Sequence, residues 1–253
     1  MEIFLWIMIV FVLLYEPIYG YYDFQKFKVN VTTNPHAREK YYINSIVGLW
    51  APTLYIILLV LFTELTFNQI GFTLPSINTN AFGPIITYTV FALTGIYILA
   101  ILYYMIGYHV SINIRTKFTE AKNREKEKSE YLAIMPVSKR EKKLWNYVSI
   151  TAGLTEEIIY RGFLIFAFSY FFPNLSVWFV VIFASLLFGL AHTYQGLLSG
   201  VLRTAIVGLI FSVLYMGLNS IIPLILLHFL IDYMAKLGED ENSIQDSRIT
   251  KIP

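Results

Sequence analysis

The stretch Thr155-Glu156-Glu157-Ile158-Ile159-Tyr160-Arg161 places two carboxylates and a guanidinium inside an otherwise apolar segment. Two later motifs add histidines to similarly apolar surroundings: Phe188-Gly189-Leu190-Ala191-His192 and His228-Phe229-Leu230-Ile231-Asp232. Ionisable side chains are costly in hydrocarbon, so those found in membrane helices face the bundle interior and mark functional sites. The three motifs predict one site inside a bundle of helices.

The composition predicts a membrane protein. Of 253 residues, 57% are hydrophobic and only 14% are charged, and the mean hydropathy is +0.59. A soluble domain could not cover so much apolar surface with polar side chains. Cysteine is absent, which excludes a disulfide framework, a thiolate nucleophile and a cysteine-ligated metal.

Seven apolar stretches approach the roughly 20 residues that a helix needs to cross hydrocarbon. They lie near residues 3–20, 43–65, 83–108, 145–172, 174–191, 196–217 and 220–236. The last two are short or interrupted by glycine, so the expected number of spans is six to eight. We therefore expect an all-α, multi-pass protein with about seven transmembrane helices.

The chain is expected to form a single membrane domain with three parts. N-terminal helices and a charged linker occupy residues 1–143, the helices that carry the motifs occupy 144–236, and a polar tail occupies 237–253. The expected location is the cell (plasma) membrane.

Basic residues are distributed unevenly between the loops. Segment 109–144 contains ten lysines and arginines, whereas segment 66–82 contains none. Loops rich in Lys and Arg stay in the cytoplasm, so segment 109–144 is expected inside and segment 66–82 outside. The glutamates interspersed in the basic segment favour a solvated connector that touches anionic lipid over a nucleic-acid site.

The two neighbouring acids are expected to differ in role. Residues four apart on a helix share a face, so Glu157 and Arg161 can form a buried ion pair, while Glu156 points about 100° away. That leaves Glu156 free to meet groups from other helices. A salt-bridge cluster without catalysis is the competing interpretation.

Glu156, His192 and His228 together form a candidate catalytic set. One carboxylate and two imidazoles on three helices could activate water, or could bind a divalent, zinc-like metal ion with one coordination position open. Asp232 lies one helical turn after His228 and could orient it or line the site. Arg203, a further intramembrane charge, is expected to snorkel toward lipid phosphate, with a substrate carboxylate as the alternative partner.

The ordered motifs resemble those of a known family. Glu156-Glu157-x-x-x-Arg161, Phe188-x-x-x-His192 and His228-x-x-x-Asp232, with the continuation Arg161-Gly162-Phe163, resemble the CPBP family of intramembrane proteases. That family includes type II CAAX prenyl endopeptidases and bacteriocin-processing or immunity proteins. The likeness runs from Leu144 to Asp232.

The resemblance implies roles for these positions. Glu156 and His192 would activate the attacking water, His228 and Asp232 would support the oxyanion, and Glu157, Arg161 and Phe188 would hold them in place. In the metalloprotease alternative, Glu156, His192 and His228 would bind the metal, with Glu157 near the water. Asp232 cannot donate a hydrogen bond unless protonated, which favours a role in orienting His228 or a metal. Of the two schemes, the metal-independent one is preferred.

The expected function is therefore hydrolysis of a peptide bond in a membrane-associated substrate, either a prenylated protein or a leader peptide. Expected partners are membrane lipid and the peptide or lipidated protein substrate, with no nucleic acid. The first alternative is a non-catalytic immunity or scaffold protein. A transporter ranks third because the chain shows no internal repeat.

Overall fold

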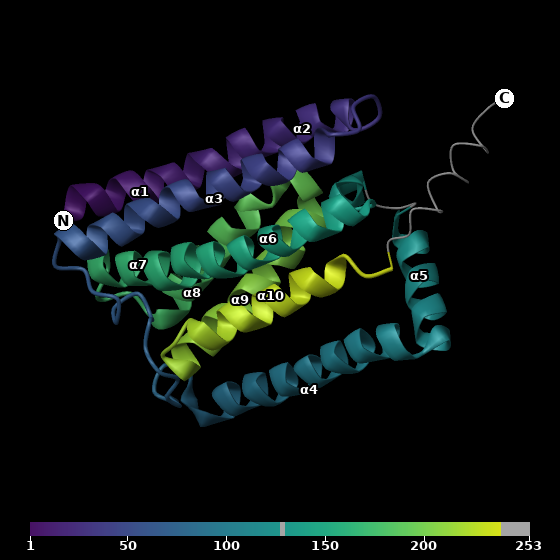
Figure 1. Cartoon of the computed structure of the whole chain (residues 1–253). Helices are drawn as coiled ribbons and strands as arrows, with labels where there is room; N and C mark the ends of the chain where they lie inside the picture. The colour runs from purple at the N-terminus through teal and green to yellow at the C-terminus, as the bar shows by residue number, and fades with distance from the viewer. Residues whose placement is uncertain (127–129, 239–253) are drawn as a thin grey trace.

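The computed structural model describes residues 1–126 and 130–238, and throughout these residues the regular structure is helical (Figure 1). Arg248 and Lys251 of the expected polar tail lie outside the described residues. The elements are α1 (Glu2–Leu14), η1 (Tyr15–Gly20), α2 (Tyr21–Asn30), α3 (Ala37–Phe62), α4 (Gly83–Val110), α5 (Ile112–Lys126), η2 (Glu130–Ile134), α6 (Lys139–Glu156), η3 (Glu157–Leu164), α7 (Ile165–Phe171), α8 (Val177–Ala191), η4 (Thr193–Gln195), η5 (Leu197–Leu202), α9 (Arg203–Leu218) and α10 (Ile222–Ala235). Segments η1, η3 and η5 are π-helical, while η2 and η4 are short 3₁₀ helices.

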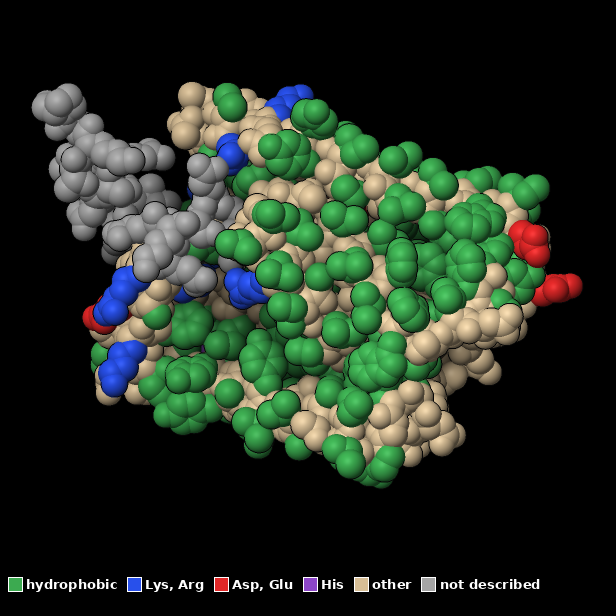
Figure 2. Space-filling view, turned by 180° about the vertical axis from the view of Figure 1, so that it is seen from behind, with side chains coloured by type: hydrophobic (Ala, Val, Ile, Leu, Met, Phe, Trp, Pro, Cys, Tyr) green, Lys and Arg blue, Asp and Glu red, His purple; other side chains and the backbone are tan. Residues whose placement is uncertain are grey.

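The helices confirm an all-α, integral membrane protein. Within residues 1–126 and 130–238, four continuous helices are long and apolar enough to span a bilayer: Glu2–Asn30, Ala37–Phe62, Gly83–Val110 and Leu197–Leu218. Helices α8 and α10 are apolar but shorter. The helix that bears the charged motif runs without a break through α6, η3 and α7. Apolar side chains cover most of the visible face of the molecule, as a lipid-facing surface requires (Figure 2).

Two helices are longer than the apolar pattern predicts. The first continues past residue 20 to Asn30, because Phe24 and Phe27 are buried in a small aromatic core with Tyr42 and Trp145. The helix expected from residue 145 begins at Lys139. There Ser138 and Glu141 form a capping box, which satisfies backbone N–H groups at the helix start.

Helix α6 is central to the packing. It contacts α3 on one side and α10 on another, while α8 packs against α9. Figure 1 shows α1 and α3 along one edge of the molecule and α4 along the other, with the motif-bearing helices between them. The helices therefore carry the three motifs into the middle of the bundle.

Glycine permits two of the closest helix contacts. A Cβ atom on Gly153 of α6 would lie 3.1 Å from the backbone of Ile225 and of Phe229 in α10. A Cβ atom on Gly189 of α8 would lie 2.5 Å from the carbonyl oxygen of Val201. Small residues allow helix backbones to approach closely in membranes, and here they bring the motif-bearing helices together.

The two ends of the bundle differ in charge. The N-terminus, segment 63–82 and the turn after α7 lie at one end, and α5 and the start of α6 lie at the other (Figure 1). Lysines and arginines gather at the α5 end, whereas acidic side chains are visible at the opposite end (Figure 2). This arrangement supports the predicted placement of segments 66–82 and 109–144 at opposite ends of the bundle. Which end faces the cytoplasm stays a prediction.

Candidate active site

A cavity of about 540 Å³ in the middle of the bundle is lined by Glu156, His192, His228 and Asp232. The four side chains come from α6, the end of α8, and α10. The cavity is closed on another side by η1, the π-helical part of the first helix. π-Helical turns are rare and occur frequently at functional sites, and the three among the described residues all contribute to this cavity or to the one beside it.

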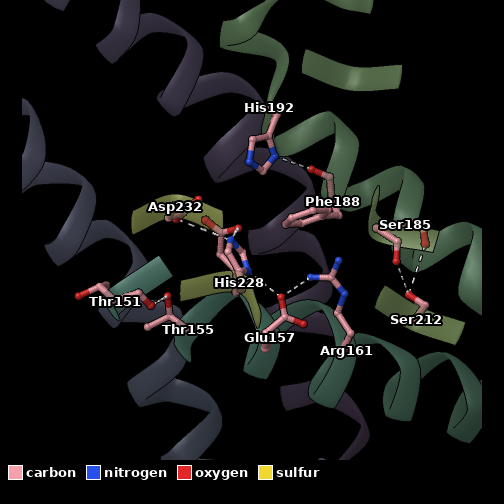
Figure 3. Close-up of polar contacts among 12 residues, drawn as sticks. Thr151, Thr155, Glu157, Arg161, Ser185, Phe188, His192, Ser212, His228 and Asp232 are labelled. Atoms are coloured by element: carbon pink, nitrogen blue, oxygen red, sulfur yellow. Dashed lines mark hydrogen bonds and ion pairs between the residues drawn. The ribbon is translucent and has the colours of Figure 1, made fainter. Parts of the chain in front are cut away.

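Glu157 occupies the fully buried position beneath the cavity. Its Oε1 atom accepts a hydrogen bond of 2.8 Å from Arg161 Nη1 and lies 2.7 Å from Nδ1 of His228 (Figure 3). The side chains of Glu157 and Arg161 are 0% and 1% exposed, so both charges are removed from water. Because an ionised carboxylate only accepts hydrogen bonds, Nδ1 of His228 carries a proton and donates a hydrogen bond to Glu157.

Two aromatic rings complete the surroundings of Arg161. Its guanidinium carbon lies 4.2 Å from the ring centroid of Phe188 and 5.0 Å from that of Phe211. Cation–π attraction of this kind strengthens when the cation is desolvated. The Nη2 atom of Arg161 has no hydrogen-bond partner among the described residues. The two rings therefore supply part of the stabilisation of the buried guanidinium.

Glu156 faces the cavity instead of the ion pair. Its Oε2 atom lies 3.8 Å from Nε2 of His228, beyond hydrogen-bond distance, and is buried without a hydrogen-bond partner among the described residues. A buried carboxylate oxygen without a donor is costly, so such an atom requires an explanation. A water molecule or substrate group in the cavity would satisfy it.

His192 is held by the residue one turn before it. Its Nδ1 atom lies 2.8 Å from the carbonyl oxygen of Phe188, and its ring contacts the Phe188 ring at a centroid distance of 4.9 Å (Figure 3). A carbonyl oxygen only accepts, so Nδ1 is the protonated nitrogen of the neutral ring. Nε2 then carries the lone pair and is available as a base or acceptor.

Asp232 lies on the other side of His228 from Glu157. One of its carboxylate oxygens is 3.8 Å from Nε2 of His228, while its backbone carbonyl accepts a hydrogen bond of 2.9 Å from Trp145. The structure therefore places Glu157 at one nitrogen of His228, and Glu156 and Asp232 near the other. The Glu157 contact was not anticipated from the sequence.

The arrangement does not fit a metal site. Among the described residues, no three His, Asp or Glu side chains are grouped to bind one ion. Glu156, His192 and His228 are thus not grouped in the way that the metal-binding alternative requires. The metal-binding expectation gains no support from this geometry.

The sequence patterns did not identify Glu16 as a site residue, and they predicted that Arg203 snorkels toward lipid phosphate. Glu16, in the π-helical segment of the first helix, lines the same cavity as Glu156. An acid inside an apolar stretch was the signal that could have identified it. Arg203 lines this cavity and also a smaller neighbouring one.

Comparison with protein families gives one match. The model of type II CAAX prenyl endopeptidase Rce1-like proteins matches residues 142–234, the segment that contains all three motifs. This segment belongs to the CPBP family. No curated protein and no solved structure matches the chain.

The match of this segment to the family indicates protease activity in a membrane context and a peptide or protein substrate. The match covers nearly all of α6 and α10, together with the elements between them. The family segment thus contains the charged and imidazole side chains of the cavity, apart from Glu16 and Asp23 on the first helix and Lys122 on α5.

Proposed function

We propose that the protein is an intramembrane endopeptidase in which Glu156 and His192 activate water for attack on a peptide bond. The observation that carries the proposal is the buried, unpartnered Oε2 atom of Glu156 in a cavity that also contains two histidines. A carboxylate in this state can accept a proton from water, as a general base does. The lone pair on Nε2 of His192 provides a second acceptor for the same water.

The reaction follows from these proton positions. Glu156 takes a proton from water as the water oxygen forms a bond to the scissile carbonyl carbon, which produces a tetrahedral oxyanion. The oxyanion then collapses, the carbon–nitrogen bond breaks, and the proton passes from Glu156 to the departing amine. General acid–base catalysis by positioned groups contributes about 10²–10⁴-fold to such reactions.

His228 is the proposed support for the oxyanion. Glu157 fixes the ring through Nδ1, which turns Nε2 toward Glu156 and Asp232 at the cavity. A proton on Nε2 makes this atom a donor to the oxyanion, and a preorganised donor is among the largest contributions to acyl-transfer catalysis. Asp232 acts in this scheme by restraining His228, because an ionised carboxylate donates no hydrogen bond.

The proposed substrate is a membrane-associated peptide, with lipidated or prenylated proteins as the preferred class because of the family match. The cavity suits an extended peptide, since aromatic side chains and polar groups both line it. Its volume of about 540 Å³ falls within the range of roughly 300–1,000 Å³ that is usual for ligand sites.

Cleavage of a peptide reporter by purified protein and by its Glu156→Gln variant tests the proposal. Glutamine preserves shape and hydrogen bonding but removes the base, so turnover should fall by at least about 10²-fold while folding and substrate binding persist. Glu120→Gln, at an exposed position on α5, is the matched control and should keep its activity. Full activity in well-folded Glu156→Gln protein would refute the catalytic assignment and favour an immunity or scaffold protein.

A further inference from the structure

Glu16 is a carboxylate of the cavity wall for which the proposed chemistry has no use. It lies in η1, outside the matched residues 142–234, and it lines the same cavity as Glu156. Among the residues that the structure describes, Glu16 forms no hydrogen bond or ion pair. Carboxylates in membrane helices normally pair with another group and mark functional positions. Glu16 is therefore available to bind a group of the substrate.

Proline explains why the first helix presents an acid to the cavity. Pro17 has no N–H to donate to the preceding turn, and here the helix widens into the π-helical turn η1. The first helix lines the cavity with one stripe of side chains, at spacings that keep them on one face. This stripe consists of Tyr15, Glu16, Tyr19, Gly20 and Asp23. It contains two carboxylates and no basic side chain.

The turn after His192 holds this stripe beside the proposed catalytic groups. Thr193 Oγ1 donates a hydrogen bond of 3.2 Å to the carbonyl oxygen of Pro17, the residue after the first acid. The ring of Tyr194 lies 5.3 Å from that of Phe24, the residue after the second acid, measured between centroids. Tyr194 also stacks on the imidazole of His192 at 5.9 Å. Both acids are thus fixed next to the segment that carries His192.

The stripe combines negative charge with aromatic rings. Oε2 of Glu16 lies 3.1 Å from the position that a Cβ atom on Gly20 would occupy, so the Glu16 side chain extends along the helix in the direction of Asp23. Tyr15 and Tyr19 are stacked on each other at a centroid distance of 5.0 Å. Carboxylates and the faces of aromatic rings both attract cations, so this wall of the cavity suits a positively charged group.

We propose that Glu16, supported by Asp23, binds a lysine or arginine side chain of the substrate and so selects peptides with a basic residue close to the scissile bond. The inference rests on the proposed protease function. A charge-assisted hydrogen bond between a basic side chain and a carboxylate is roughly twice as strong as a neutral one. Glu16 determines specificity in this scheme and does not touch the reacting atoms, while Glu156 carries the chemistry.

A lysine scan of an uncharged, apolar reporter peptide tests the assignment. Lysine replaces each residue near the scissile bond in turn, and norleucine at the same position is the neutral reference. Vesicles of neutral lipid are used, so that lysine does not concentrate the peptide at the membrane surface. At one position we expect lysine to raise kcat/KM about ten- to hundredfold over norleucine. The gain should appear mainly in KM, because the contact is the same in the ground state and the transition state.

Variants of the two acids assign the preference to this wall. In Glu16→Gln the lysine-to-norleucine ratio of kcat/KM should fall to about one, whereas Glu16→Asp keeps the charge and should retain part of the preference. Asp23→Asn should lower the ratio by a smaller factor. Because each ratio compares two peptides with one preparation, it does not depend on the fraction of folded protein.

Glu2→Gln is the matched control. It removes the same charge from the same helix, at an exposed position that does not line the cavity, and should keep the wild-type ratio. An equal loss of the ratio in Glu2→Gln would mean that net charge causes the preference, and would overturn the assignment. An unchanged ratio in both Glu16→Gln and Asp23→Asn would overturn it as well.

Other outcomes separate this inference from the proposed function. Equal cleavage of lysine and norleucine peptides by the wild type at every position would overturn the cation site and leave the protease function intact. If well-folded Glu16→Gln cleaves no peptide, Glu16 takes part in the chemistry and the specificity role is overturned. If the wild type cleaves none of the peptides, the proposed function fails and this inference fails with it.

Discussion

Nδ1 of His228 lies 2.7 Å from Oε1 of Glu157, the same oxygen that accepts a hydrogen bond from Arg161. One carboxylate oxygen therefore joins η3 to α10 and completes the ion pair within η3. The adjacent acid, Glu156, has no such bond and faces the cavity. The two consecutive glutamates thus have different roles: Glu157 holds Arg161 and His228 in place, and Glu156 stays available for the proposed chemistry.

The first prediction concerns the stability of this network. Arg161→Ala leaves the fully buried Glu157 without its cationic partner, and breaking a buried ion pair costs about 3–5 kcal/mol. We expect a lower thermal unfolding temperature in detergent as well as lost peptidase activity. Arg115→Ala, at an exposed position, is the control. An unchanged unfolding temperature for Arg161→Ala would show that the pair does not stabilise the fold.

The second prediction concerns the distance between α6 and α10. A Cβ atom at Gly153 would lie 3.1 Å from two backbone atoms of α10, so Gly153→Val should push this helix, and His228 with it, away from Glu156. Overpacking of this kind costs about 1–3 kcal/mol, and Gly153→Ala should show a smaller effect. Activity per folded protein is the measurement.

Gly95→Val controls for the change in helix propensity that follows when valine replaces a helical glycine. Gly95 lies in α4, and a Cβ atom there would meet nothing within 4 Å. Wild-type activity in Gly153→Val would contradict the close approach of α6 and α10 that the structure describes.

The sequence predicted the membrane helices and the Glu157–Arg161 pair well, because both follow from local rules. Apolar length identifies a span, and a spacing of four residues brings two side chains onto one helix face. The contact between Glu157 and His228 could not be predicted in this way. It depends on how closely two helices approach at Gly153, and no pattern within either helix specifies that distance.

The same limit applies to the first helix and to Arg203. The apolar pattern ends near residue 20, but buried aromatic residues from α2, α3 and α6 extend the helix to Asn30. Glu16 lies inside the first apolar stretch, whose length predicts a span but not which of its residues face the cavity. For Arg203, the sequence gives its depth in the membrane, but its role depends on which face of α9 meets the cavities.

The third prediction concerns orientation. Lysines and arginines are concentrated at the end of the bundle that carries α5, so this end is expected in the cytoplasm. In the cysteine-free background, an impermeant thiol reagent applied to intact cells should label Asn80→Cys but should reach Arg124→Cys only after permeabilisation. Both positions are exposed. The reverse labelling pattern would invert the topology.

The fourth prediction separates the two nitrogens of His192. Nδ1 donates to the carbonyl oxygen of Phe188, and Nε2 is the proposed acceptor for water. In His192→Asn the amide nitrogen can still donate to Phe188, but nothing remains at the position of Nε2. We therefore expect near-native thermal stability with turnover reduced by about 10²–10⁴-fold, the contribution of one general acid–base group.

His192→Ala is the comparison for this test. It removes both nitrogens, so it should lower the unfolding temperature as well as turnover, because the Phe188 carbonyl loses its donor and the Phe188 ring loses its neighbour. Equal stability of the two variants would show that the Nδ1 contact does not stabilise the end of α8. Substantial turnover by well-folded His192→Asn would remove Nε2 from the mechanism and leave Glu156 as the sole proposed base.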